Sequence, residues 1–343
     1  MMTDRDEVFM RAALLEAKKA LGRTSPNPAV GAVLVIGNRI ASKGHHREAG
    51  RAHAEIECLR NFGAPIPARA TLYVTLEPCS TAGRTAPCTE AIIKAGLKSV
   101  VTGATDPNPR HSGRGIVELR KAGVRVRDGI LAEECTRVNE GFNKWIVTGE
   151  PFVIAKCGLS LDGRLTRAPG ESRWITGSDA RRHAHHLRAR MDAVLVGAET
   201  VRADNPRLTI RSVRRARQPW RIVLTRSGQL PRHAHVLSDK FADRTLIYER
   251  KSLASVLKDL GKRDITSVLI EGGGEILGEA LDKRLIDKVQ IYLGPTLTGG
   301  PVIAFPGAGV ARTADALRLR DIEYEQIGQT ISFSGYPDIQ AFE

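Results

Sequence analysis

The residues of this sequence best suited to metal chemistry are one histidine and two cysteines, with a glutamate close to the histidine. His53 and Glu55 stand two residues apart, and Cys79 and Cys88, each preceded by proline, stand nine apart. One His and two Cys ligands hold Zn²⁺ and leave a fourth position for a water whose pKa falls toward about 7. A carboxylate that is not a ligand can then move the proton. The pattern predicts hydrolytic removal of an exocyclic amine from a pyrimidine, with Glu55 as the acid and base.

Each of these residues also has an ordinary structural interpretation. His-x-Glu is common by chance, buried free cysteines are usual core residues, and the nine-residue gap departs from Cys-x-x-Cys. The joint pattern of a histidine at a helix start and two Pro-Cys pairs favours the zinc site. Cys58 lies five residues from His53 on the same expected helix, a poor angle for one metal, so we expect it to pack. Cys135 and Cys157 are expected to be core residues.

The elements that must position these residues alternate between helix and strand. We expect an amphipathic helix over 6–20, a hairpin of strands 29–36 and 39–44, and a helix from His53 to the residue before Gly63. Strands at 71–76, 99–102 and 124–127 then alternate with helices at 89–95 and 115–122. This order predicts a sheet layered between helices.

A break near Thr148-Gly149-Glu150-Pro151 divides the chain into expected domains of residues 1–148 and 149–343. The second half again alternates, with Ser178 as the expected N-cap of its first helix. Its expected strands are 152–156, 193–196, 221–224, 245–248, 268–270 and 288–293, and its expected helices are 178–187, 253–260 and 275–281.

A glycine-rich turn, Glu271-Gly272-Gly273-Gly274, follows one of these strands and opens a helix. Glycines let backbone amides approach a pyrophosphate at a helix N-terminus, although most such turns are only turns. The G-x-G-x-x-G of a Rossmann domain is missing after the first strand of this half, so that fold is not expected.

Composition narrows the class of protein. The 343 residues are 42% hydrophobic, and no stretch approaches the roughly 18 apolar residues of a membrane helix. Without the features of a signal peptide at the N-terminus, we expect a cytoplasmic protein with no membrane partner. Five cysteines, an odd number, argue against a disulfide framework. The net charge of +14 is scattered and aromatic residues make up only 5%, which favours a solvated basic surface or pockets for phosphorylated small molecules over a nucleic-acid partner.

Several longer motifs resemble those of the bifunctional deaminase–reductases of riboflavin biosynthesis, the RibD/RibG family, and the resemblance covers essentially the whole chain. It implies an α/β protein of two domains, a cytidine-deaminase-like three-layer α/β/α N-terminal domain and a dihydrofolate-reductase-like α/β C-terminal domain. The motifs are Pro26-Asn27-Pro28-Ala29-Val30-Gly31, Thr75-Leu76-Glu77-Pro78-Cys79-Ser80, Gly83-Arg84-Thr85, Pro87-Cys88, Asp106-Pro107-Asn108-Pro109, residues 156–164, residues 171–176 and Glu271-Gly272-Gly273.

The resemblance also implies two reactions. The first is zinc-dependent deamination of 2,5-diamino-6-ribosylamino-4(3H)-pyrimidinone 5′-phosphate, and the second is NADPH-dependent reduction of the ribosyl chain of the aminouracil product to ribityl. Folds of this kind often form homo-oligomers, so we expect a dimer or a tetramer.

Residue roles follow from the same resemblance. In the first domain it implies substrate contacts by Asn27, His46, Arg84, Asp106 and Asn108. In the second it implies substrate contacts by Ser172, Arg188, Leu208, Arg211 and Glu271, with Arg188 or Arg211 on the phosphate. Lys156 and Glu271 are candidates for protonating and orienting the ring-opened sugar. The NADPH site would comprise Gly158, Trp174, Thr200, Asp204, Gly273, Gly274, Glu275, Ile276, Leu277, Gly278 and Glu279.

Simpler interpretations of these residues stay open. Asn27 and Asn108 stand between prolines and also suit turns. Trp174 also suits a core, and Arg188 suits a solvated helix face. His183, His185 and His186 complete no metal-ligand set, which favours a solvated basic helix.

The chain departs from the family pattern twice. Thr81-Ala82 follows Pro-Cys-Ser, where the family usually has histidine first, and Thr225-Arg226 replaces the usual Asp-Ser. Arg226 either meets the 2′-phosphate of NADPH or points to solvent. These departures leave open an enzyme with only one active domain. A second alternative is a tRNA adenosine or free cytidine deaminase, against which the nine-residue cysteine gap and the second-half motifs argue. A third is a non-catalytic zinc-stabilised module, which would need neither Glu55 nor a glycine-rich turn.

Overall fold

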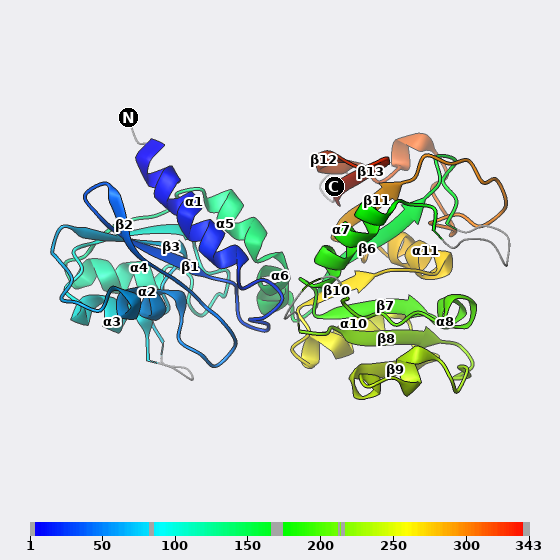
Figure 1. Cartoon of the computed structure of the whole chain (residues 1–343), viewed down its shortest axis with the longest axis horizontal. Coiled ribbons are helices and arrows are strands. Elements are labelled where there is room, and N and C mark those ends of the chain that lie inside the picture. Colours follow the sequence, from blue (N-terminus) through cyan, green and yellow to red (C-terminus); the bar gives the residue numbers. More distant parts are fainter. Residues whose placement is uncertain (1–3, 82–85, 166–173, 212, 214–216, 339–343) are drawn as a thin grey trace. The chain divides into compact units, whose positions relative to one another are not determined.

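The computed structural model describes residues 4–81, 86–165, 174–211, 213 and 217–338. The chain divides into two compact units, Met1–Gly149 and Glu150–Glu343, and Figure 1 labels their elements. The expected domain ranges, 1–148 and 149–343, differ from this division by one residue. No helix within the described ranges is long and apolar enough to cross a membrane.

The first unit is built on one mixed sheet of five strands. They are β1 (Gly31–Ile36), β2 (Arg39–His45), β3 (Ala70–Leu76), β4 (Ser99–Ala104) and β5 (Arg125–Arg127). Their order is β2-β1-β3-β4-β5, with β1 antiparallel to β2 and β3, and with β3, β4 and β5 parallel. β3 and β4 are almost wholly buried, because helices cover both faces of the sheet.

The helices of this unit are α1 (Asp4–Lys18), α2 (Ala54–Phe62), α3 (Cys88–Lys94), α4 (Arg114–Lys121), α5 (Ala132–Val138) and α6 (Glu140–Thr148). α1 and α5 lie on one face of the sheet and α2, α3 and α4 on the other, which confirms the expected three layers (Figure 1). Glycine permits the closest approaches. A Cβ at Gly31 would overlap the backbone of α1 at Ala13, and a Cβ at Gly44 would overlap the backbone of α2 at Cys58.

The second unit is built on a sheet of eight strands. They are β6 (Phe152–Leu159), β7 (Ala193–Gly197), β8 (Trp220–Thr225), β9 (Thr245–Glu249), β10 (Ser267–Ile270), β11 (Lys288–Leu293), β12 (Leu319–Ile327) and β13 (Thr330–Pro337). Their order is β12-β13-β11-β6-β10-β7-β8-β9. All neighbours from β11 to β9 are parallel, whereas β12 and β13 are antiparallel additions at one edge.

Helices cover both faces of this second sheet. They are α7 (Ser178–Arg188), α8 (Ala198–Asp204), α9 (His235–Ser238), α10 (Leu253–Lys262) and α11 (Gly274–Asp282), with short 3₁₀ helices η1 (Ala242–Arg244) and η2 (Thr313–Asp315). Val153 and Ala155 of β6 pack in one core with α10 and α11, whereas Ile154 packs on the opposite face with Leu187 of α7. Since side chains alternate along a strand, Lys156 lies on the α7 face.

Several elements were not expected from the sequence. α5, α6 and α8 are short, and β12 is exposed along almost its whole length, so it lacks the alternation of buried and exposed residues that marks a strand. The prediction that Ser178 is the N-cap of α7 is wrong by one residue. The N-cap is Gly177, whose backbone N–H donates to Thr330 Oγ1 at 3.2 Å.

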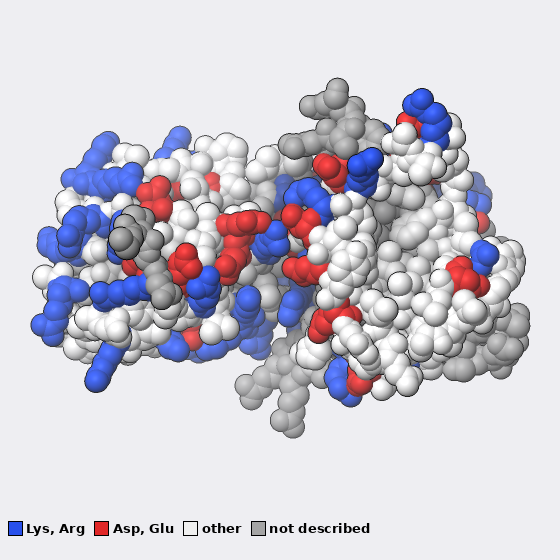
Figure 2. All heavy atoms as spheres, turned by 90° about the horizontal axis from the view of Figure 1, so that it is seen from above, with Lys and Arg blue, Asp and Glu red and all other residues white. Residues whose placement is uncertain are grey.

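The positive charge is divided over the surface. On the face shown in Figure 2, Lys and Arg form several separate groups with Asp and Glu between them, over both units. This face therefore carries mixed charge despite the net +14 of the chain.

Candidate functional site

Three potential metal ligands come together at the starts of two helices and after one strand. His53 is the N-cap of α2, Cys88 is the first residue of α3, and Cys79 follows β3. His53 Nδ1 lies 3.5 Å from Cys79 Sγ and 3.3 Å from Cys88 Sγ, and the three atoms all lie within 4.8 Å of one another. A tetrahedral zinc ion with bonds of about 2.0–2.3 Å separates its ligands by about 3.5 Å. The donor set and its spacing therefore fit zinc, and no other such group occurs among the described residues.

The two thiols of this group share one proton. The hydrogen bond from the Cys88 thiol, helped by His53, holds the pKa of Cys79 at about 4 although burial opposes the shift. The same hydrogen bond and burial raise the pKa of Cys88. The backbone N–H of Cys88 also donates to Cys79 Sγ at 3.4 Å. One thiolate is thus present at neutral pH, and the thiolate is the form that binds metals.

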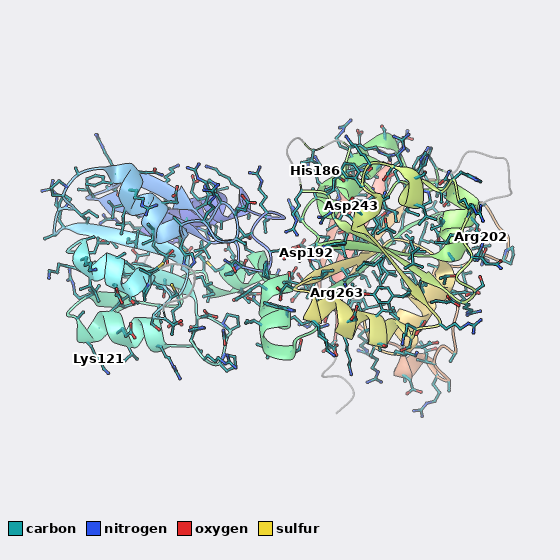
Figure 3. All side chains as sticks on the ribbon, turned by 90° about the horizontal axis from the view of Figure 1, so that it is seen from below. Lys121, His186, Asp192, Arg202, Asp243 and Arg263 are labelled. Atoms are coloured by element: carbon teal, nitrogen blue, oxygen red, sulfur yellow. The ribbon has the colours of Figure 1, made fainter. Side chains whose placement is uncertain are left out.

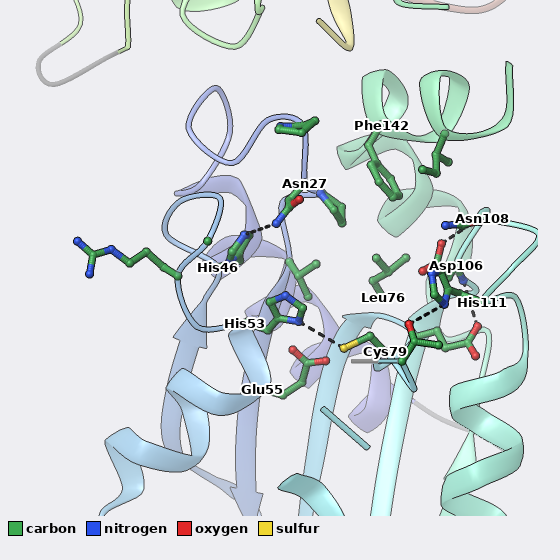
Figure 4. Close-up of a pocket in the computed structure, with 18 residues that line it drawn as sticks. Asn27, His46, His53, Glu55, Leu76, Cys79, Asp106, Asn108, His111 and Phe142 are labelled. Carbon is green, nitrogen blue, oxygen red and sulfur yellow. Dashed lines mark hydrogen bonds between the residues drawn. The ribbon is translucent and has the colours of Figure 1, made fainter. Parts of the chain in front are cut away.

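Glu55 lies in the first turn of α2 and is buried beside this group. Burial and the Cys79 charge raise the pKa of Glu55 to about 7, against the opposing effect of His53. A carboxyl group with such a pKa can accept a proton and return it near neutral pH. Figure 4 shows its side chain next to His53 and Cys79.

His53, Glu55 and Cys79 line a pocket of about 390 Å³ within the first unit. Figure 4 shows Asn27 and His46 on one side of it and Asp106, Asn108 and His111 on the other. The structure thus brings four of the five expected substrate contacts of this unit together with Glu55. The fifth, Arg84, lies outside the described residues, as does Ser172 of the second unit.

His46 fixes the orientation of the Asn27 amide. His46 Nδ1 lies 3.0 Å from the carbonyl oxygen of Ala52, which can only accept, so Nδ1 donates. Burial lowers the pKa of His46, which favours the neutral ring. Its Nε2 therefore accepts from Asn27 Nδ2 at 3.2 Å, and the carbonyl oxygen of Asn27 is directed to other donors.

Asn108 does act as a turn residue, as the simpler interpretation held, and so does Asp106. Asp106 Oδ1 accepts from the backbone N–H of Asn108 at 2.9 Å, and Asn108 Oδ1 accepts from that of Arg110 at 3.0 Å. Both residues nevertheless line the pocket, so the turn and a contact with a ligand are compatible.

Glu77, two residues before Cys79, is a buried anchor that the sequence analysis missed. Its Oε2 accepts from the backbone N–H of Asp106 at 3.2 Å and of Gly113 at 2.9 Å. Its Oε1 accepts from the N–H of Gly115 at 2.8 Å and of Ile116 at 3.4 Å. One carboxylate therefore ties the loop with Asp106 and the start of α4 to the segment with Cys79. Its only signal in the sequence is its place in the Thr75–Ser80 motif.

Other pocket residues were also missed. Phe142 and Ile146 stand one turn apart on the unexpected helix α6 and give the pocket an apolar wall. Arg51 and His111 add polar groups. Thr81, at the first departure from the family pattern, keeps a polar contact there, because its hydroxyl lies 3.2 Å from His111 Nδ1.

In the second unit, a buried ion pair joins α7 to the end of β10. Arg188 donates to both carboxylate oxygens of Glu271, at 2.9 and 2.7 Å, and to the backbone oxygen of Thr209 at 2.7 Å. Burial opposes ionisation, yet the charges of Arg188 and Lys156 hold the pKa of Glu271 at about 2. Arg188 is therefore not on a solvated helix face.

Further polar groups lie on the same face of the sheet. Lys156 Nζ lies 5.8 Å from the centre of the Tyr292 ring, and the Tyr292 hydroxyl is 2.8 Å from His183 Nδ1. His183 thus makes a hydrogen bond with the sheet. The expectation that all three histidines of this helix are solvated is wrong for His183. Leu208, in the left-handed region at φ 52°, and Arg211 belong to the loop that Arg188 holds through Thr209.

The glycine-rich turn connects β10 to α11 as expected. Gly273 has φ 80°, and a Cβ at Gly272 would lie 3.4 Å from Thr200 Oγ1. This places Thr200 beside the turn, while Asp204 ends the same helix, α8. Gly158 faces Thr176, where an added Cβ would lie 3.4 Å from the methyl group.

The remaining residues expected at the cofactor divide into two groups. One group is buried in α11 and comprises Ile276, Leu277 and Gly278. By contrast, Trp174 is 55% exposed, and the guanidinium of Arg181 lies 4.7 Å from the centre of its ring. Trp174 is therefore not a core residue. The acidic residues of α11 already have partners. Glu279 accepts from the N–H of Leu253 and from Lys283, and the exposed Glu275 pairs with Arg226 at 3.2 Å.

Two family models match the chain. The cytidine and deoxycytidylate deaminase zinc-binding region matches residues 3–104, and the RibD C-terminal domain matches residues 151–333. The riboflavin biosynthesis protein RibD of Synechocystis sp. is 40% identical over an alignment that covers 96% of both chains. The chain belongs to the RibD family. It is therefore a bifunctional enzyme of riboflavin biosynthesis, with a zinc-binding deaminase domain and a reductase domain.

Solved RibD structures agree with this fold throughout. Acinetobacter baumannii RibD (form 1) is 38% identical, with a TM-score of 0.90 over 97% of this chain and 99% of that one. The diaminohydroxyphosphoribosylaminopyrimidine deaminase/5-amino-6-(5-phosphoribosylamino)uracil reductase of Thermotoga maritima is 34% identical, with a TM-score of 0.87 and the same coverage. The two-domain α/β architecture is thereby confirmed as that of RibD.

Proposed function

We propose that the first unit deaminates 2,5-diamino-6-ribosylamino-4(3H)-pyrimidinone 5′-phosphate at a zinc ion held by His53, Cys79 and Cys88. The second unit then reduces the ribosyl chain of the aminouracil product to ribityl with NADPH. The observation that carries this proposal is the meeting of the three ligands, two of which line the pocket with buried Glu55. The name of the Thermotoga maritima relative, a deaminase and reductase, supports the same pair of reactions.

In the deaminase pocket, bound zinc supplies an activated water next to Glu55. Glu55 would carry one proton to the ring nitrogen and then a second proton to the leaving amine, which suits its raised pKa. The directed amide of Asn27 reads a donor on the substrate, while Asp106 and Asn108 bind from the opposite side. Phe142 and Ile146 offer apolar surface to the pyrimidine ring. In this proposal Arg84 completes the substrate contacts.

In the reductase, bound NADPH supplies the hydride. The turn at Gly273 and Gly274, with Thr200 beside it, offers backbone N–H groups at the start of α11 to the cofactor's phosphates. The residues that we propose to complete the cofactor site are Gly158, Trp174, Asp204 and the α11 segment Glu275, Ile276, Leu277, Gly278 and Glu279.

The reductase substrate meets a row of charges with distinct roles. Glu271 stays ionised because of its low pKa, so it orients Lys156 and Arg188 and does not donate a proton. Lys156 is left as the proton donor to the ring-opened sugar. Arg188 is already paired with Glu271, which leaves Arg211 as the partner for the phosphate. Ser172 and Leu208 complete the proposed contacts.

The test follows ammonia release and NADPH absorbance together, with zinc-loaded protein and the diamino-pyrimidinone phosphate. We expect ammonia release followed by NADPH oxidation. Glu55→Gln should abolish both, yet it should still reduce the aminouracil when this is supplied directly. Glu57→Gln, in the same helix turn but paired with Arg47 at 3.3 Å, is the matched control and should keep both activities. No ammonia from zinc-replete wild-type protein would refute the proposal.

A further inference from the structure

We infer that His185 of α7 binds the phosphorylated aminouracil in the reductase site, where its ring hydrogen-bonds an uncharged polar atom of the substrate. The class of atom is a sugar hydroxyl or a pyrimidine carbonyl. The inference rests on the proposed function of the second unit, and it gives a role to a histidine that the reaction described above does not use.

His185 lies on α7 between a contact with Trp174 of the proposed cofactor site and a contact with Glu271 of the proposed substrate site. Arg181, His185 and Arg188 are spaced four and three residues apart, so they share one face of the helix. At one end of this face Arg181 stacks over Trp174, and at the other end Arg188 binds Glu271. Since a helix rises about 1.5 Å per residue, His185 lies about 6 Å along the axis from Arg181 and about 4.5 Å from Arg188.

The surroundings of His185 are charged groups from several different elements. Arg188 of α7, Arg211 of the adjacent loop, Glu271 after β10 and Lys156 of β6 all act on its ring electrostatically. These are the groups to which the proposed reaction assigns the substrate. The His185 ring therefore lies within electrostatic reach of these groups.

The Nδ1 atom of His185 is buried and has no hydrogen-bond partner within the described part of the chain. A buried polar atom without a partner is unfavourable, and most native proteins pair such atoms with protein, water or ligand. The other two histidines of the trio differ. His183 is bonded to the Tyr292 hydroxyl, and His186 is exposed (Figure 3). His185 is thus the member whose polar atom is left for a ligand.

The charge state of His185 indicates which ligand atoms it suits. Burial, together with Arg188 and Arg211, lowers its pKa to about 4, so the ring is neutral near pH 7. A neutral ring leaves the phosphate to Arg211 and pairs well with an uncharged donor or acceptor. This division matches a substrate that carries one phosphate and several hydroxyl and carbonyl groups.

The test compares His185→Leu, His185→Asn and His186→Leu in the full chain. The assay is steady-state reduction of the aminouracil phosphate by NADPH, with the melting temperature measured in parallel. For His185→Leu we expect the KM of the aminouracil to rise about tenfold, with kcat and the KM of NADPH within about twofold. His185→Asn places an amide where Nδ1 stands and should recover most of the loss. His186→Leu should match the wild type.

A purely structural role for His185 predicts a different pattern. Replacing an unpaired buried polar atom by leucine would then keep or raise the melting temperature and leave the KM unchanged. If the wild type is active and His185→Leu leaves the KM of the aminouracil unchanged, the inference about His185 is wrong while the proposed function still stands. If His185→Leu does not fold, His185→Gln takes its place, because its amide reaches the Nε2 position and should leave the KM raised. A wild type that does not reduce the aminouracil would instead overturn the proposed function.

Discussion

The Arg188–Glu271 pair should contribute strongly to the stability of the second unit, and Glu271→Gln tests this. The side chains of Arg188 and Glu271 are only 13% and 6% exposed, and two hydrogen bonds join them. The substitution leaves the guanidinium charged and buried opposite a neutral amide. Removing one partner of a buried pair typically lowers the free energy of unfolding by about 3–5 kcal/mol.

The pKa of Glu271 gives a second value for the contribution of this pair to the free energy of unfolding. It falls from an ordinary 4.5 to about 2, chiefly through Arg188 and Lys156 and against burial. At 1.36 kcal/mol per pKa unit, the ionised carboxylate stabilises the folded state by about 3 kcal/mol. Because the pKa is lowered on folding, this contribution is complete above about pH 4.5 and disappears as the pH falls toward 2. The difference between wild type and variant should shrink over that range.

The assay is urea unfolding followed by tryptophan fluorescence, in a Trp145→Phe background. Trp174 and Trp220 then report on the second unit alone. Glu275→Gln is the matched control. Its pair with Arg226 is 73% and 91% exposed, so it should change the unfolding free energy by less than about 1 kcal/mol. Arg188→Met combined with Glu271→Gln should recover part of the loss, because no unpaired charge remains.

Two results would refute this reasoning. One is a loss of less than about 1 kcal/mol in Glu271→Gln at pH 7, since a buried unpaired guanidinium cannot be that favourable. The other is a difference between wild type and variant that stays constant from pH 5 to pH 3. That result would show that the carboxylate is not ionised through Arg188 and Lys156.

Three further outcomes are expected. Glu77→Gln turns an amide nitrogen toward backbone N–H groups, so the KM for deamination should rise about tenfold while the rate of reduction is unchanged. An unchanged KM would show that the loop with Asp106 keeps its conformation without Glu77. Cys88→Ser should lose zinc, measured by elemental analysis, together with ammonia release, but keep reduction of added aminouracil; retained zinc would exclude Cys88 as a ligand. Arg226→Ala should keep the ratio of kcat/KM for NADPH to that for NADH within about twofold of the wild-type ratio, because Arg226 is exposed and paired with Glu275. A lost preference for NADPH would instead assign Arg226 to the 2′-phosphate.

The three potential metal ligands could be predicted from the sequence, because their residue types and local elements are evident there. His53 and Cys88 each begin a helix, and Cys79 follows an apolar strand, so residue type and element boundaries were enough to predict their meeting. The apolar runs of β1 and β3 likewise marked buried strands. By contrast, Glu77 satisfies backbone N–H groups from 29 to 39 residues away, and no local pattern indicates such a partner. Phe142 reaches the pocket from α6, a helix too short to show a clear periodicity.

The proposed reductase site shows why the rest of the prediction depends on tertiary structure. More than 100 residues of sequence separate Lys156 from both Glu271 and Tyr292. Yet Lys156 lies on β6, Tyr292 lies on the neighbouring β11, and Glu271 directly follows β10 on the other side. The register pairs Ala155 with Ile270 and Gly158 with Tyr292, which puts Glu271 and the Tyr292 ring on either side of Lys156. Alternation along β6 then decides that Lys156 faces α7 and its Arg188. A solvated helix was a reasonable interpretation of α7 because its residues are mostly polar. Only strand order and register show that those polar residues cover a row of buried charges.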